Sequence, residues 1–69
     1  MAKVILLINV KIGKAQNVKE ALEGIGMTAD IVTGPYDIDA VADGDLATII
    51  DQVGEIEGIE RILPQIKIG

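Results

Sequence analysis

Residues 4–10 read VILLINV, a run that is aliphatic except at Asn9 and rich in β-branched side chains. Such side chains favour β-strands. A strand with one face in water would alternate apolar and polar residues, whereas this run is apolar at both alternating positions. The run therefore predicts a central strand that is covered on both faces.

Two later segments have the spacing of amphipathic helices. Apolar side chains recur at i, i+3, i+4 and i+7, with polar residues between them. Gly24 and Gly26 are expected to end the first helix, and the carboxylates of Asp43 and Asp45 to cap the start of the second. The apolar positions are Val18, Ala21, Leu22 and Ile25 in the first segment, and Leu46, Ile49, Ile50 and Val53 in the second.

Three further strands are predicted over residues 28–32, 36–42 and 59–68, with a Gly34-Pro35 turn before the second of them. The order β-α-β-β-α-β consists of two βαβ halves, which is typical of the ferredoxin-like α+β fold. We expect a four-stranded antiparallel sheet in the order 4-1-3-2, with both helices on one face. Pro64 lacks an N–H for a ladder hydrogen bond, which suits the edge position of the last strand. Residues 1–69 leave room for one domain only.

The sheet face away from the helices has no cover from this short chain. A domain of about this length buries only about 60% of its unfolded surface, and an uncovered apolar face marks an interface in a soluble protein. The first strand presents aliphatic side chains on that face in either orientation, so we expect a homodimer or a larger assembly. The alternative is that Lys3, Asp39 and Lys67 make the face polar enough to stay in water.

The chain has no Cys, His or Ser. Their absence excludes disulfides, thiolate and imidazole metal sites, and nucleophile pairs of the Ser–His or Cys–His type. We therefore expect no enzymatic activity and no cofactor. A small dimeric enzyme that works through Tyr36 and Asp37 is an alternative that the missing His disfavours.

The charge balance argues against nucleic acid as a direct partner. Six basic and eleven acidic side chains give a net charge of −5, and there is no Trp or Phe for base stacking. Residues 4–10 are too few to cross a bilayer, and no cleavage site of a signal peptide follows them. The sequence predicts a soluble, cytoplasmic protein without membrane contact.

The most suggestive segment for a site is TGPYD, residues 33–37. It joins the only aromatic side chain to a carboxylate and to two residues that fix the backbone. Main-chain groups of a tight loop, together with a carboxylate for an ammonium group, suit the head of an amino acid. The alternative is an ordinary hairpin turn whose tyrosine covers the sheet edge. The candidate ligand contacts are Thr33, Gly34, Pro35, Tyr36 and Asp37.

Four aspartates crowd the third strand and the turn after it. Their oxygens would suit Mg²⁺ or Ca²⁺, but their spacing does not match an EF-hand loop. Helix capping and a solvated acidic rim explain them better, so no metal site is expected. These residues are Asp37, Asp39, Asp43 and Asp45.

The chain resembles the ligand-binding domain of the leucine-responsive/asparagine regulator (Lrp/AsnC) family, also called the RAM domain. The resemblance covers nearly the whole chain. It is carried by LINV at residues 7–10 followed by Gly13-Lys14, by VTGPYDI at residues 32–38, and by Gly58-Ile59. The Thr-Gly-Pro-Tyr-Asp hairpin is the specific element. The related ACT-type amino-acid-sensing domain shares the topology and is separated from it only by that motif.

The resemblance implies a stand-alone RAM-type domain over residues 1–69, without the helix-turn-helix domain that precedes it in full-length members. It further implies sheet-to-sheet dimers in larger rings, with amino-acid effectors near the hairpin and contacts from Gly34, Tyr36 and Asp37. The resemblance also implies that the chain co-assembles with a full-length Lrp/AsnC regulator and in this way modulates transcription.

The chain departs from that family at two places. Residues 62–64 are Ile-Leu-Pro where the family often has Thr-x-Thr, and Asp39 stands where an apolar residue is usual. The first departure favours an alternative function, a purely structural oligomerisation module without an effector.

Overall fold

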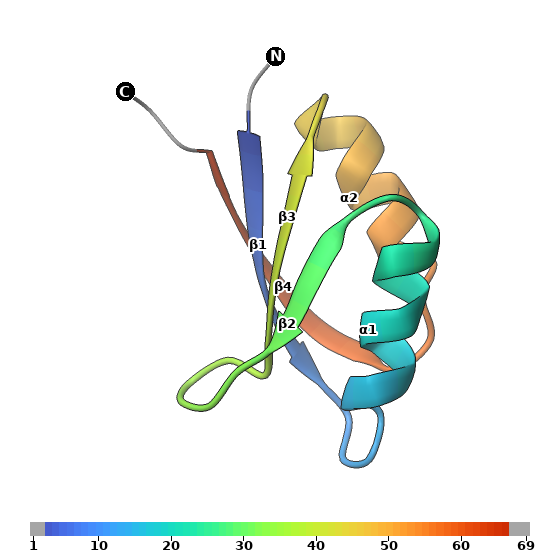
Figure 1. Ribbon diagram of the computed structural model, residues 1–69, viewed down its shortest axis with the longest axis vertical. Coiled ribbons are helices and arrows are strands. Elements are labelled where there is room, and N and C mark those ends of the chain that lie inside the picture. The colour runs from blue at the N-terminus through green and yellow to red at the C-terminus, as the bar shows by residue number, and fades with distance from the viewer. Residues whose placement is uncertain (1–2, 67–69) are drawn as a thin grey trace.

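The computed structural model describes residues 3–66 and confirms the predicted order of elements (Figure 1). All neighbouring strands pair antiparallel in the order β2-β3-β1-β4, which is the predicted order 4-1-3-2. The predicted last strand ran to Ile68; its end, including Lys67 and Ile68, lies outside the described residues. The elements are β1 (Lys3–Val10), α1 (Ala15–Gly24), β2 (Thr28–Ile31), β3 (Ile38–Asp43), α2 (Leu46–Gly54) and β4 (Ile59–Ile66).

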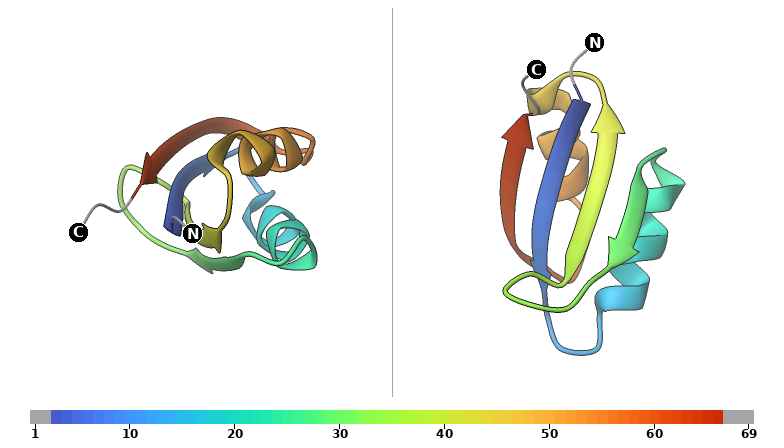
Figure 2. Two further views of the ribbon diagram at one scale, coloured as in Figure 1. Left: turned by 90° about the horizontal axis from the view of Figure 1, so that it is seen from above. Right: turned by 60° about the vertical axis from the view of Figure 1, so that its left-hand side comes forward.

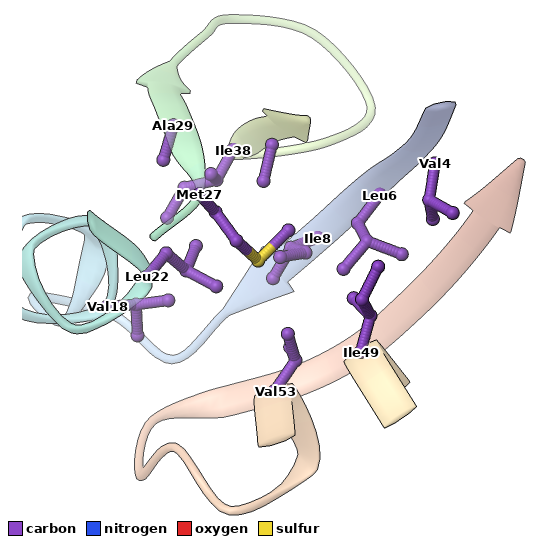
Figure 3. Packing of buried hydrophobic residues seen from close by; sticks show 11 residues of the cluster. Val4, Leu6, Ile8, Val18, Leu22, Met27, Ala29, Ile38, Ile49 and Val53 are labelled. Carbon is purple, nitrogen blue, oxygen red and sulfur yellow. The ribbon is translucent and has the colours of Figure 1, made fainter. Parts of the chain in front are cut away.

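Both helices cover one face of the sheet, as predicted (Figure 2). The alternation along β1 decides which side chains they cover. Val4, Leu6 and Ile8 are completely buried against the helices, whereas Ile5 and Leu7 point to the other face and are only partly buried. Figure 3 shows the core between the layers, to which the helices contribute Val18, Leu22, Ile49 and Val53 and the strands and the turn before β2 contribute Met27, Ala29, Ile38 and Ala40.

We call the face away from the helices the open face. Its residues follow from strand alternation and from the registers that pair the strands. They are Lys3, Ile5, Leu7 and Asn9 on β1, Asp39, Val41 and Asp43 on β3, Thr28 and Asp30 on β2, and Arg61, Leu63 and Gln65 on β4.

The helix ends follow the predicted signals. α1 ends at Gly24, and Gly26 adopts a positive φ of 92° in the turn that leads to β2. Asp45 caps α2, because its carboxylate accepts the N–H of Thr48 at 3.1 Å. Asp43, the other predicted cap, is the last residue of β3 instead. Within residues 3–66 neither helix has the length and apolar character needed to cross a membrane.

The connection between β2 and β3 is longer than the sequence predicted. β2 ends at Ile31 instead of Val32, and β3 begins at Ile38 instead of Tyr36. One hydrogen bond, from the Val32 N–H to the Asp37 carbonyl at 2.9 Å, closes a loop over residues 32–37. Asp37, which was predicted to lie in the third strand, instead ends this loop and binds β1 through its N–H and its carboxylate, as described below.

Gly58, in the turn between α2 and β4, packs this turn tightly against the start of α1. Its φ is 102°, and a Cβ at this position would lie 3.1 Å from the Cβ of Lys14 and 3.3 Å from a methyl group of Val18. Its carbonyl also accepts the N–H of Lys11 at 2.8 Å. Only glycine fits both the backbone conformation and the space.

Candidate functional site

The loop over residues 32–37 lies on the side of the sheet away from the helices (Figure 2). Asp37 fastens its end to β1 by two hydrogen bonds. The Asp37 N–H donates to the Ile8 carbonyl at 2.9 Å, and the Asp37 Oδ2 accepts the N–H of Val10 at 2.9 Å. The other carboxylate oxygen, Oδ1, accepts no hydrogen bond from the residues that the structure describes. One oxygen of Asp37 is thus committed to the fold, and one remains for other partners.

Asn9 holds the middle of the same loop. Its Nδ2 donates to the Pro35 carbonyl at 2.9 Å, so the one polar side chain of the first strand's apolar run binds the loop that crosses it. Gly34 has a φ of 119° with no atom within 4 Å of a Cβ placed there, so it supplies the turn conformation and not a close contact. Thr33 and Pro35 are exposed and Tyr36 is partly buried.

A β-bulge in β4 adds two charged side chains next to Asn9. The register pairs Asn9 with Arg61 and Val10 with Ile59, which leaves Glu60 as the extra residue. A bulge re-aims the side chains around it. Glu60 and Arg61 consequently both lie beside Asn9 at this end of the sheet.

Four side chains line a depression of about 400 Å³, namely Asn9, Asp37, Glu60 and Arg61. We call it the polar depression. Its volume lies in the range of small-molecule sites, and none of its lining side chains is apolar. Among residues 3–66 the one ion pair joins Lys19 and Glu23 at 2.8 Å. The guanidinium of Arg61 therefore lies more than 4.0 Å from the carboxylate oxygens of Asp37 and Glu60. Donors and acceptors of both charges therefore face the same space.

Asp37 is the member of the predicted site that lines the polar depression. The other four predicted residues, Thr33 to Tyr36, form the loop beside it. Sequence reasoning did not select Asn9, Glu60 or Arg61 as site residues. Asn9 carried a signal, since it is the one polar residue in an apolar run, whereas the bulge at Glu60 has no glycine or other local mark.

The open face forms a second feature. Ile5, Leu7, Val41 and Leu63 give it an aliphatic centre, and Leu63 is 40% exposed. Asp39 interrupts this centre, in register with Leu7 on one side and with Asp30, a second carboxylate, on the other.

The Oδ1 of Asp39 is buried and has no hydrogen-bond partner within the described part of the chain. The polar residues at the rim include Lys3, which is exposed and in register with Asp43. Within residues 3–66 no group of three or more acidic side chains is placed to hold a metal ion.

No protein-family model matches the chain, and no curated protein sequence does. Solved structures of small proteins do match it over nearly their whole length. TTHA0845 from Thermus thermophilus is 25% identical, with 100% of this chain and 95% of that chain covered and a TM-score of 0.87. FFRP-DM1 is 25% identical, with 99% of this chain and 100% of that chain covered and a TM-score of 0.82. The hypothetical protein PHS023 from Pyrococcus horikoshii is 24% identical, with 99% of this chain and 90% of that chain covered and a TM-score of 0.84. The chain therefore shares the ferredoxin-like α+β fold of these small proteins.

Proposed function

We propose that the chain is an Lrp/AsnC-like regulatory module that binds an amino acid and assembles with copies of itself, without enzymatic activity. The designation FFRP denotes regulators of the Lrp/AsnC type, and the similarity to FFRP-DM1 spans both chains. The observation that carries ligand binding is the polar depression, where the loop over residues 32–37 meets the bulge of β4.

The chemistry of the depression suits a zwitterion. The guanidinium of Arg61 presents paired N–H donors to a carboxylate, and such charge-assisted bonds are among the strongest hydrogen bonds in proteins. The free oxygen of Asp37 and the carboxylate of Glu60 accept hydrogen bonds from an ammonium group. The loop residues Gly34 and Tyr36 precede Asp37 in the chain and are not among the residues that line this space.

Self-association is supported by the open face. Ile5 and Leu7 remain partly exposed on a central strand, next to the exposed Leu63 on β4. A second copy covering this face would remove apolar surface from water at roughly 25 cal/mol per Å². Light scattering should accordingly give at least twice the mass of the chain at micromolar concentration. A stable, folded monomer under those conditions would contradict the assembly.

A thermal-shift screen against the twenty amino acids tests ligand binding. A ligand that binds only the folded state stabilises it by RT ln(1 + [L]/Kd), which is about 2.7 kcal/mol at a hundredfold excess over Kd. We expect one amino acid, or one chemical class, to raise the melting temperature. A silent panel from a protein that still assembles would favour the purely structural module, in line with Ile62-Leu63-Pro64 in place of Thr-x-Thr.

Regulation of transcription then requires a partner, which we propose to be a full-length Lrp/AsnC-type regulator in the cytoplasm. With a net charge of −5 the chain lacks the basic surface that tracks phosphates. In gel-shift experiments at physiological salt, the chain alone should not retain duplex DNA. Sequence-specific retention by the chain alone would contradict the need for a partner.

A further inference from the structure

We propose that the ligand of the polar depression is an amino acid with a cationic side chain, of the lysine or arginine class. This inference rests on the proposed function, namely that the depression binds an amino acid. The depression offers two carboxylates, from Asp37 and Glu60, against one guanidinium, from Arg61. The head of an amino acid brings one ammonium and one carboxylate and would leave one protein carboxylate without a counter-charge. A second cation on the ligand supplies it.

The arrangement of the strands sets the reach of the ligand. Arg61 pairs with Asn9 from the β4 side. Asp37 adjoins Asn9 from the β3 side, because its N–H binds the carbonyl of Ile8. Adjacent strands lie about 4.8 Å apart, so the backbones of Asp37 and Arg61 are separated by roughly 10 Å. An extended basic amino acid carries its carboxylate and its terminal cation at opposite ends of a methylene chain and suits such a span.

The assignment of the ligand groups follows from this order. Arg61 receives the α-carboxylate in the bidentate geometry that guanidinium groups favour. Glu60, its neighbour in the bulge, receives the α-ammonium. The Oδ1 of Asp37 receives the side-chain cation at the far end, while its Oδ2 stays bound to the N–H of Val10.

Other side-chain classes fit less well. An aliphatic side chain would gain little apolar contact, because all four lining residues are polar or charged. An acidic side chain would place a second negative charge beside the carboxylate of Asp37, and the repulsion between the two would weaken binding. The lining of the depression thus selects charge at both ends of the ligand.

Lysine and two compounds that each lack one of its charged groups provide the test, measured by calorimetry on the unmodified protein. Lysine carries both ends, norleucine lacks the terminal amine, and cadaverine lacks the carboxylate. We expect lysine to bind at least about tenfold more tightly than either, since each comparison removes a hydrogen bond between charged groups. Cadaverine also tests a diamine as the source of the cation, and binding as tight as that of lysine would overturn the role of Arg61.

Variants place the effect at the depression. Glu60→Gln should weaken lysine binding by about tenfold or more. Glu57→Gln makes the same change of charge at an exposed position that does not line the depression, and should leave lysine binding unchanged. Equal losses in both variants would show that the net charge of the chain, and not the site, attracts the ligand.

The remaining outcomes separate this inference from the proposed function. Binding of leucine or glutamate that is tighter than binding of lysine would overturn the cationic ligand and leave an amino-acid-binding module. No binding of any amino acid would overturn the amino-acid-binding function, and the inference with it.

Discussion

The two faces of the sheet are built from the same strands but differ in how far the chain can cover them. On β1, Val4, Leu6 and Ile8 are completely buried by the helices, whereas Ile5 and Leu7 keep part of their surface in water. The covered face is continuously apolar and has no buried polar side chain among the described residues. It is the face whose packing holds the domain together.

The open face has aliphatic residues at its centre but is not uniformly apolar. Asp39 sits between Leu7 and Asp30, and the polar depression occupies the end where Asn9 and Arg61 meet. An unpaired carboxylate among aliphatic side chains, such as that of Asp39, does not help a solitary domain to fold. One face thus specifies the fold, and the other is the face on which we propose that a ligand and a second copy bind.

The largest expected effect comes from comparing neighbours on β1. Leu6→Ala should lower the free energy of unfolding by about 2–5 kcal/mol, because it leaves a cavity in a filled core. Leu7→Ala should lower the free energy of unfolding clearly less at low protein concentration, because Leu7 is then still partly in water. It should weaken self-association instead. Urea denaturation at two protein concentrations measures both quantities. Equal losses that do not depend on concentration would contradict the division between the faces.

Asp37 holds the loop over residues 32–37 to β1 and, in our proposal, also contacts the ligand. Its Oδ2 binds the N–H of Val10, so Asp37→Ala should cost roughly 1–3 kcal/mol of stability by leaving that N–H without its partner. Loss of its Oδ1 should also weaken ligand binding by about 1.5–3 kcal/mol. Calorimetry and thermal denaturation of the same variant measure the two effects. A loss of stability with unchanged affinity would assign Asp37 to the loop alone.

Two glycines with similar backbone angles sharpen the comparison. Gly58 and Gly34 have φ values of 102° and 119°, so alanine costs about 1–2 kcal/mol at either site from the backbone alone. A Cβ at Gly58 would also press against Lys14 and Val18 at the start of α1, whereas a Cβ at Gly34 would meet open space. Gly58→Ala should therefore cost more than Gly34→Ala in thermal denaturation. Equal costs would mean that the turn before β4 adjusts without disturbing α1.

Hydrophobic periodicity was enough to predict the order of elements, and the fold that this order indicates gave the strand order and the placement of both helices on one face. It could not decide the orientation of β1, since residues 4–10 are apolar at both parities. The helices settle it by covering Val4, Leu6 and Ile8. The segment TGPYD drew attention to the loop before β3, whose last residue, Asp37, lines the polar depression, but the depression itself depends on pairing between distant residues. Asn9 and Arg61 meet only through the β1–β4 register, and Glu60 reaches them only through a bulge.

The smallest expected effect concerns the charge in the middle of the open face. The Oδ1 of Asp39 is buried without a hydrogen-bond partner among the described residues, and Asp30 presents a second carboxylate in register with it. The other charged groups of this face, Lys3, Asp43 and Arg61, are not in register with it. When a second copy covers the face, the carboxylate loses its remaining water, which is unfavourable for an unpaired charge.

Asp39→Asn keeps the size of the side chain and removes the charge, so self-association should tighten by about 1 kcal/mol, several-fold in the dissociation constant. Asp43→Asn makes the same change at the exposed end of β3, opposite Lys3, and should have little effect. Sedimentation across a dilution series measures both variants. Weaker association of Asp39→Asn would show the opposite arrangement, in which the second copy brings a cation to Asp39, and the open face would then select its partner by charge as well as by apolar surface.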